Sequence, residues 1–358
     1  MLVFRYLAKE VFTTLAALTT LLLLIFLSNQ FVHYLARAAA GQLPGIIVLK
    51  LMMLEIPNLL GLLLPLGFYM AVLVAYGRLY ADSEMTILHA CGLSLGQLLR
   101  ITMVFACIIA FLVAFLVLWV GPFIAKDRKQ LIEGGGAAAL IQTLLPAQFQ
   151  AIDHGRRVFY VQNVSRNRQK ASDIFLAEQS DHLDQKIWKV VWAKAGFVKT
   201  DPKTHQPLVV LQAGRVYQGE SGRGDFKVLT FDRYETRLPE TGFALKKDDV
   251  STMETKALWP MHNSDLKKAT ELHWRLSMPL MVIILGFLAV PLSRVHPKQG
   301  KFAKLLPAIV IYIIYANMMF ITRDWLMTET LPQIFGFWWL HALVLGLALF
   351  LFQRKTRL

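Results

Sequence analysis

The sequence predicts an α-helical membrane protein with six transmembrane helices, arranged three plus three, and an inserted all-β domain. Apolar residues fall into six blocks, three before residue 122 and three after residue 276, with a polar stretch between the two groups. Each block matches the bilayer core, because a helix rises roughly 1.5 Å per residue and about 20 residues span the hydrocarbon. The chain is also 55% hydrophobic, more than a soluble domain of its size usually contains.

The first membrane half is expected over residues 1–122. Its opening segment, MLVFRYLAKE, is basic and amphipathic enough to lie at the membrane surface. A cleaved signal peptide ending at Ala38–Ala40 is disfavoured, because the apolar block before it is longer than a signal core. Pro57 and Pro65 are expected to bend or end the second helix locally. Three spans are predicted, at about residues 11–34, 55–76 and 98–122.

The inserted domain is expected over residues 123–275. It opens with KDRKQLIEGGGAAAL, which is typical of a linker or a short helix leaving the third span. Five alternating runs rich in valine and aromatic residues then predict an antiparallel sandwich or open roll: RRVFYVQNV, SDIFLAE, KIWKVVWAKAGFV, PLVVLQAGRVYQG and FKVLTFDRYET. Their inward residues should line a closed core or an open apolar groove: Val158, Tyr160, Val190, Trp192, Val210 and Val216.

The second membrane half is expected over residues 276–358. Three spans are predicted, at about residues 276–292, 302–321 and 335–352, with Pro279, Pro291 and Pro307 as local bends or ends. Basic residues concentrate on one set of flanks, so both termini and the loops 77–98 and 293–301 should be cytoplasmic. Residues 123–275 should then lie outside.

The loop between the second and third spans has the pattern of a short helix. Asp82 or Ser83 can cap it, Glu84 stands in its first turn, and Gly92 is placed to end it. A cytoplasmic helix between two spans either couples a transporter to a separate motor subunit or is a plain amphipathic connector. The pattern alone leaves both interpretations open.

The outer end of the first span carries polar groups on one helix face, because Asn29, His33 and Arg37 fall at i, i+4 and i+8. Such a set can hold a phosphorylated lipid head group through charge-assisted hydrogen bonds. The alternative is that Arg37 and Lys50 snorkel into the interfacial water. The complete set of candidate lipid contacts includes two residues of the fifth span: Gln30, His33, Arg37, Lys50, Asn317 and Arg323.

Composition and motifs restrict the function. The net charge of +14 favours anionic lipid surfaces, because no nucleic-acid module is recognisable. The nearest fragment to a nucleotide-binding loop, Gln299–Lys301, lacks the upstream glycine and the following hydroxyl. Asp153 with His154, and His182 between acidic residues, show no standard metal spacing. A non-catalytic chain without a cofactor is therefore expected.

Four stretches, in order along the chain, carry a family resemblance: SEMTILHACGLS in the first loop, WVGP at Trp119–Pro122, HWRL at His273–Leu276, and VPLSRVHPKQGKFAKLLPA at Val290–Ala308. They resemble the lipopolysaccharide-export permeases of the LptF/LptG family. The HACG form at His89–Gly92 and the PxQG form at Pro297–Gly300 are most similar to the LptF branch.

The resemblance implies a subunit of an ATP-driven exporter in the Gram-negative inner membrane, which extracts lipopolysaccharide and delivers it to a periplasmic bridge. The implied partners are a homologous LptG-like permease in a heterodimer, a dimeric cytoplasmic ATPase and a bitopic LptC-like protein. The inserted domain would be a periplasmic β-jellyroll. The loop would dock into the ATPase with Glu84 as the main charged contact, and its coupling residues would be Asp82, Ser83, Glu84, Met85, Leu88, His89 and Gly92.

Two other functions compete with this interpretation. A secondary transporter normally carries buried ionisable residues at the midplane, whereas the predicted spans are nearly free of acids, with Glu55 near an end. A membrane-anchored periplasmic enzyme or scaffold would need only one or two spans as its anchor.

Overall fold

The computed structural model describes residues 2–39, 45–134, 147–152, 157–165, 170–182, 185–200, 207–220, 226–237, 250–259, 265–294, 305–333 and 335–356. The chain divides into two compact units. We call one the helical unit, which comprises Met1–Ser28, Leu54–Lys126 and Asp249–Leu358. The other is the sheet unit, which comprises Asn29–Met53 and Asp127–Asp248.

The first group of helices contains α1 (Leu2–Ala39), α2 (Gly45–Ala81), α3 (Glu84–Ala90), α4 (Leu95–Phe115), the π-helical turn η1 (Leu116–Val120) and α5 (Gly121–Gly134). The second contains the 3₁₀ turn η2 (Val250–Thr252), α7 (Thr255–Leu258), α8 (Leu266–Ser293), α9 (Leu305–Met327) and α10 (Trp338–Thr356). Among the described residues, five helices are long and apolar enough to cross a membrane, and α10 is a shorter apolar helix. A multi-pass helical membrane protein is thus confirmed, with five to six apolar helices where six spans are predicted.

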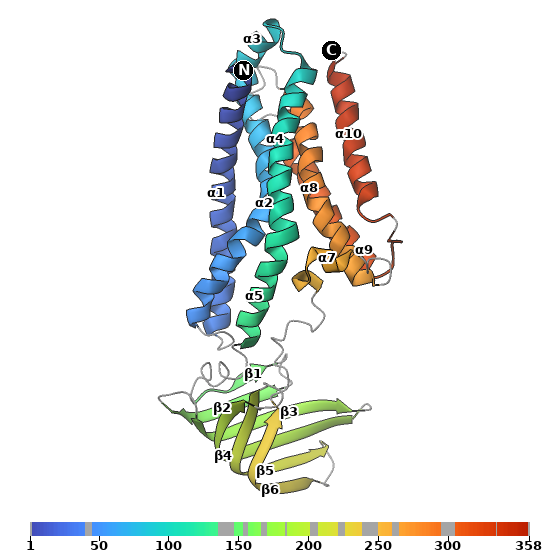
Figure 1. The fold of residues 1–358 in the computed structure, drawn as a ribbon. Helices are drawn as coiled ribbons and strands as arrows, with labels where there is room; N and C mark the ends of the chain where they lie inside the picture. Colours follow the sequence, from blue (N-terminus) through green and yellow to red (C-terminus); the bar gives the residue numbers. More distant parts are fainter. Residues whose placement is uncertain are drawn as a thin grey trace. The chain divides into compact units, whose positions relative to one another are not determined.

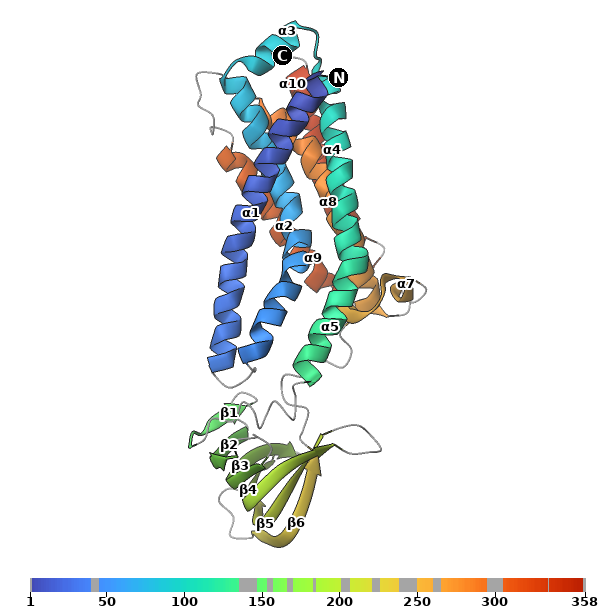
Figure 2. The same cartoon turned by 60° about the vertical axis from the view of Figure 1, so that its left-hand side comes forward.

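The helices continue past the prolines that were expected to bend or end them, and past the predicted end of the third span. Pro57 and Pro65 lie inside α2, and Pro279 and Pro291 lie inside α8, so none of them ends its helix. Apolar helices tolerate proline because neighbouring groups satisfy the freed backbone carbonyls. Helix α4 continues through η1 into α5 and so extends past residue 122, as Figure 2 shows. Of the two alternatives expected for the segment after the third span, a linker or a short helix, the structure shows a helix up to Gly134. Residues 135–140 lie outside the described residues, as does Ala40.

The N-terminal segment that resembles a surface helix is continuous with the first span. One helix, α1, runs from Leu2 to Ala39. Leu7 and Val11 are fully buried in the core of the helical unit. The first two turns of α1 therefore pack against other helices along one face.

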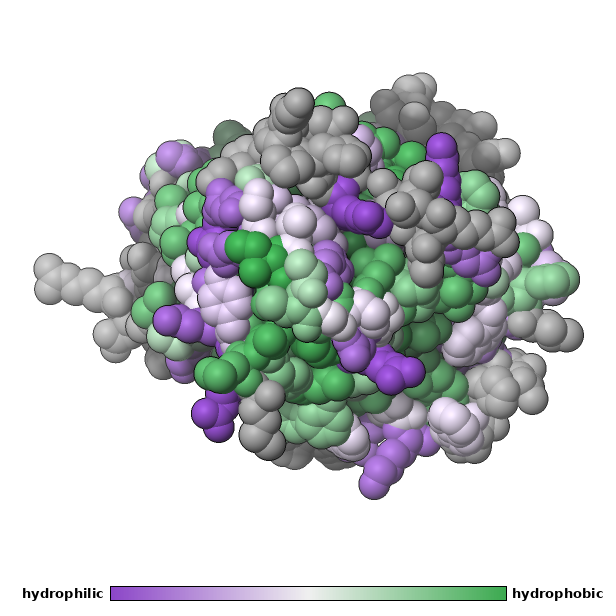
Figure 3. All heavy atoms as spheres, turned by 90° about the horizontal axis from the view of Figure 1, so that it is seen from above, coloured by the Kyte–Doolittle hydropathy of each residue, from purple (hydrophilic) through white to green (hydrophobic). Residues whose placement is uncertain are grey.

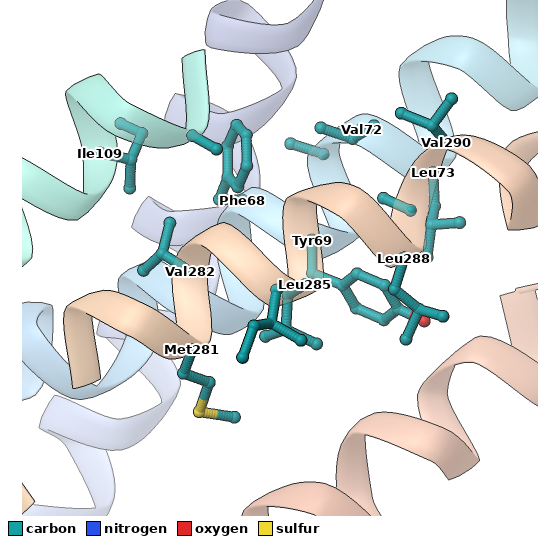
Figure 4. Close-up of a cluster of buried hydrophobic side chains, with 14 of the residues drawn as sticks. Phe68, Tyr69, Val72, Leu73, Ile109, Met281, Val282, Leu285, Leu288 and Val290 are labelled. Atoms are coloured by element: carbon teal, nitrogen blue, oxygen red, sulfur yellow. The ribbon is translucent and has the colours of Figure 1, made fainter. Parts of the chain in front are cut away.

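The core of the helical unit surrounds α8, which packs between α4 and α10 (Figure 1). Phe68 from α2, Ile109 from α4 and Val282 and Leu285 from α8 meet there (Figure 4). Lipid tails are as apolar as these side chains, so close packing holds such helices together. Gly286 permits this approach, because a Cβ atom there would lie 3.0 Å from Phe68 Cε1 and from Ala106 Cβ.

The described strands of the sheet unit form one six-stranded antiparallel sheet in the order β1-β2-β3-β4-β5-β6. Each strand pairs with its neighbours in the sequence, and all five predicted runs form strands. The bounds are β1 (Gln150–Ile152), β2 (Arg157–Val164), β3 (Lys170–His182), β4 (Gln185–Thr200), β5 (Pro207–Glu220) and β6 (Lys227–Arg237). Only the three-residue β1 has no counterpart among the predicted runs.

One face of the sheet holds its buried cluster, which consists of Val161, Ala171, Ile174, Val191, Ala193, Leu211, Val216 and Phe231. The opposite face carries most of the residues expected to point inward. Val158 and Val190 both pair with Ala177, and Tyr160 and Trp192 both pair with Phe175, so these pairs form neighbouring rows.

This second face is more open. Trp192 and Tyr217 are each 39% exposed, and Val228, which pairs with Tyr217, is 56% exposed. Val216, expected to share this face, belongs instead to the buried cluster. The strands are apolar on both faces, so alternation shows which residues share a face but does not show which face is covered.

Candidate functional site

The loop between α2 and α4 forms a short, well-defined helix, α3. Ser83 precedes it in a left-handed conformation with φ 63°, and its side chain makes no capping hydrogen bond, so the predicted serine cap is absent. Gly92 ends the helix as predicted, with φ +96°. The Gly92 N–H donates to the His89 carbonyl at 3.0 Å, and the Leu93 N–H donates to the Leu88 carbonyl at 3.0 Å. This pair of bonds is a Schellman motif, which favours glycine at that position.

Apolar and polar contacts anchor α3 to the helical unit. Met85 is fully buried in the main core, and Leu88 packs against that core. The hydroxyl of Tyr80, at the end of α2, lies 3.0 Å from His89 Nε2. His89 Nδ1 donates to the Leu93 carbonyl, since a carbonyl oxygen can only accept. The helix is therefore held as a rigid extension of α2.

Glu84 stands on the exposed side of this helix. The Tyr6 hydroxyl, from the start of α1, donates to its carboxylate. Nearby, Arg78 of α2 pairs with Glu10 of α1. Asp82 is also exposed. Seen from the α3 end, the molecule carries hydrophilic side chains between hydrophobic ones (Figure 3). The site combines a buried apolar anchor with an accessible carboxylate.

The candidate lipid contacts divide between the two units. In the sheet unit, His33 and Arg37 of α1 and Lys50 of α2 are exposed, while Gln30 is partly exposed. Tyr34 lies about 100° further round α1 than His33 and is buried with Val48 and Leu51 of α2. His33 and Arg37 share an exposed face of α1, and their spacing predicts the shared face.

In the helical unit, Asn317 and Arg323 occupy different settings. Asn317 is exposed, and its amide donates to the Ile313 carbonyl of its own helix at 2.8 Å. Arg323 donates to Glu271 Oε2 at 2.9 Å, and its guanidinium lies 4.8 Å from the ring centre of Trp274. The charge of Arg323 is thus already partly engaged within the helical unit.

Sequence reasoning missed the buried ionic cluster of which Arg323 forms the edge. Arg275 of α8 is 2% exposed and donates to Glu271 Oε1 at 2.9 Å. We call residues 250–255 the return segment. The Arg275 guanidinium also donates to four of its groups: the carbonyls of Val250 (3.4 Å), Ser251 (2.9 Å) and Met253 (2.9 Å) and the hydroxyl of Thr255 (3.0 Å). The HWRL motif contains Arg275, so the sequence marked the residue but did not indicate its role.

The same cluster reaches the π-helical turn. The Thr255 hydroxyl donates to the Leu118 carbonyl of η1 at 2.7 Å. A π-helical turn widens the backbone ladder, and such turns are frequent at functional sites. Thr255 therefore links η1 to Arg275, and Glu271 links Arg275 to Arg323. This cluster, formed by Glu271, Arg275, Arg323 and Thr255, joins α8, α9, η1 and the return segment.

These features define a class: a multi-pass membrane protein that presents a rigid short helix between two spans and carries an inserted antiparallel sheet. The family model described as lipopolysaccharide export system permease LptF/LptG matches residues 5–354, and the chain belongs to this family. The chain is 31% identical to the lipopolysaccharide export system permease protein LptF of Escherichia coli K12 over 316 residues, which cover 88% of this chain and 84% of that protein. The LptF protein of Shigella flexneri matches with the same identity and coverage.

The predicted family is therefore confirmed, and the relatives named here belong to the LptF branch that the HACG and PxQG forms favour. The chain is a permease of the lipopolysaccharide export system and a non-catalytic transmembrane component of an ATP-binding-cassette transporter. Family membership implies a lipopolysaccharide export complex. It leaves the secondary transporter and the anchored scaffold without support.

Proposed function

We propose that this chain is an LptF-type permease that extracts lipopolysaccharide from the inner membrane and passes it to a periplasmic bridge. Its partners would be a homologous LptG-like permease, a dimeric cytoplasmic ATPase and a bitopic LptC-like protein. The observation that carries the proposal is the exposed Glu84 on a helix whose other side is buried through Met85. A soluble ATPase can bind such a helix through Glu84 and displace the transmembrane helices that pack against Met85.

The coupling step follows from how α3 is anchored. A basic group of the ATPase would pair with Glu84, and Asp82, Ser83, Leu88, His89 and Gly92 would keep α3 in position. Met85 is part of the same core as α2 and α4. Closure of the motor would therefore displace these helices together, because packed cores move as units rather than deform continuously. The cavity between the two permeases would narrow and expel the lipid.

The lipid contacts support the same function. Arg37 and Lys50 present exposed cationic groups, with His33 and Gln30 on the same helix as Arg37. Phosphates of the head group would pair with them. Asn317 and Arg323 would contribute from α9, where Arg323 would exchange part of its contact with Glu271 for the lipid. If these residues only snorkel, photo-crosslinkers placed at positions 37 and 50 will not capture lipopolysaccharide in native membranes.

The sheet unit suits a lipid conduit. Its open face bears Trp192, Tyr217 and Val228 in partly exposed rows. We infer that this face belongs to a periplasmic β-jellyroll within residues 123–275, between membrane halves at 1–122 and 276–358, with both termini cytoplasmic. Acyl chains would lie on the open face. A free strand edge would pair with the bitopic partner by strand addition.

The test of the proposed function is export in cells that carry the mutant as the sole copy. Glu84→Ala should abolish or strongly impair lipopolysaccharide delivery to the outer membrane while the protein still inserts. Glu84→Gln removes the charge but keeps an acceptor for Tyr6, so it should impair export as well. Glu329→Gln removes another exposed charge outside α3 and serves as the control. Normal export by both Glu84 variants would refute the coupling role.

A further inference from the structure

The start of α1 lies beside α3 at one end of the helical unit, as both ribbon views show (Figures 1 and 2). Tyr6 and Glu10 are four residues apart on α1 and so share one face of that helix. Glu10 pairs with Arg78 near the end of α2, and the Tyr6 hydroxyl donates to Glu84, the first residue of α3. This face of α1 therefore spans the junction between α2 and α3.

Apolar packing fixes the position of this part of α1. Leu7 and Val11 are fully buried in the core of the helical unit. The rings of Phe4 and Phe12 both contact the ring of Phe105 from α4, with ring centres 5.2 Å and 5.5 Å apart. The first turns of α1 are thus held in place by the core and do not depend on their polar contacts with α2 and α3.

The bond from Tyr6 engages one oxygen of the Glu84 carboxylate. Tyr6 donates to Oε2, and within the described part of the chain Oε1 makes no hydrogen bond. An ionised carboxylate offers about four acceptor positions on its two oxygens. Tyr6 therefore restricts the orientation of the exposed Glu84 side chain and leaves it able to accept a charge-assisted bond from a cationic group of another protein.

We propose that Tyr6 is a positioning residue of the ATPase-coupling site, whose hydroxyl holds the Glu84 carboxylate in the orientation in which a cationic group of the ATPase binds it. This inference rests on the proposed coupling role of Glu84. Ordering one flexible side chain at an interface weakens binding by about twofold to tenfold, and Tyr6 orders Glu84 before the ATPase binds. The coupling site then extends beyond the loop between α2 and α4 to the start of α1.

The experiment measures how tightly the ATPase binds the permease. The full chain, purified with its homologous permease and reconstituted in nanodiscs, is titrated with the purified ATPase of the same export system while permease-dependent ATP hydrolysis is recorded. Tyr6→Phe removes only the hydroxyl, so the half-saturating ATPase concentration should rise about fivefold. The maximal rate at saturation should stay unchanged, because the docked Glu84 makes the same contact. A damaged permease would instead lower the maximal rate.

A double-mutant cycle separates positioning from any other role of Tyr6. In the Glu84→Ala background, Tyr6→Phe should change the half-saturating concentration by less than about twofold, since no carboxylate is left to orient. Glu10→Gln is the control, because it alters the same face of α1 without removing a bond to Glu84. The ion pair of Glu10 with Arg78 is partly exposed and contributes little, so this variant should bind the ATPase as the parent does.

Three outcomes would overturn the inference. Unchanged or tighter binding by Tyr6→Phe would mean that the hydroxyl is not needed or that it hides the carboxylate. An equal loss in Tyr6→Phe with and without Glu84 would mean that Tyr6 acts by another route. An equal loss in Glu10→Gln would assign the effect to the docking of α1. In all three cases Glu84→Ala can still weaken binding and export, whereas failure of the proposed function would appear as normal binding and export by Glu84→Ala itself.

Discussion

The helical unit holds charged side chains in two opposite ways. At the α3 end, Glu84 is exposed and its described hydrogen-bond partner is the Tyr6 hydroxyl. In the ionic cluster, Glu271 and Arg275 are buried, and the Arg275 guanidinium donates to acceptors on Glu271, on residues 250, 251 and 253, and on Thr255. The difference separates a charge kept available for another molecule from charges used to join parts of this one.

The physical reason lies in desolvation. A charge that stays in water keeps its hydration and can exchange one partner for another at little cost. A buried charge has lost that hydration, and removing one member of its pair leaves the other uncompensated. The ionic cluster should therefore control stability, and Glu84 should control export.

The largest expected effect comes from Arg275→Met, which keeps much of the volume and removes all five hydrogen bonds. Loss of one partner of a buried ion pair costs about 3–5 kcal/mol, so the purified variant should unfold at a much lower temperature than the parent. Arg323→Met, at a half-exposed position, should lower it far less. Equal shifts in thermal unfolding for the two variants would contradict the distinction between buried and accessible charges.

A smaller effect is expected from Thr255→Val, which replaces a hydroxyl with a methyl group of similar size. The variant loses the bond to Leu118 and one acceptor of Arg275, so a loss of about 1–3 kcal/mol is expected. Thr328→Val, which removes an exposed hydroxyl bonded within its own turn, is the control. Hydrogen exchange of the η1 amides should rise in Thr255→Val only; unchanged protection there would count against the link.

The smallest expected effect on stability concerns the α3 end, where Glu84 is exposed. Gly92→Ala places a side chain at φ +96°, where no atom lies within 4 Å, so the cost is backbone strain of about 1–2 kcal/mol. Gly96→Ala, inside α4, should be neutral or slightly stabilising because alanine favours helix. Exchange of the α3 amides should rise in the first variant and stay unchanged in the second. A stable α3 in Gly92→Ala would show that the contacts of Met85, Leu88 and His89 fix the loop without the glycine turn.

Much of the fold could be predicted because it depends on local composition. The apolar blocks predict the helices, and alternation in residues 156–236 predicts five of the six described strands. The segment after residue 122 was expected as a linker or a short helix, and it is helical up to Gly134; its polar composition could not distinguish between these two alternatives. The covered face of the sheet was missed because Trp192 and Val191 are both apolar.

The α3 helix and the ionic cluster also differ in how far the sequence predicts them. Gly92 was predicted to end α3 because only its own backbone conformation matters. Arg275 could not be assigned, since its acceptors in residues 250–255 and the second partner of Glu271, Arg323, are brought together only by the fold. The HWRL pattern marked the position, but a motif does not state its contacts.

The bond from Thr255 to the Leu118 carbonyl has a mechanical consequence. The chain leaves the helical unit after Lys126 and re-enters it at Asp249, so the Thr255 hydroxyl joins the outgoing and incoming ends of the long insertion. Arg275, which donates to Thr255, connects this bond to α8. A force applied to either end of the insertion would therefore reach α4, through η1, and α8 at the same time.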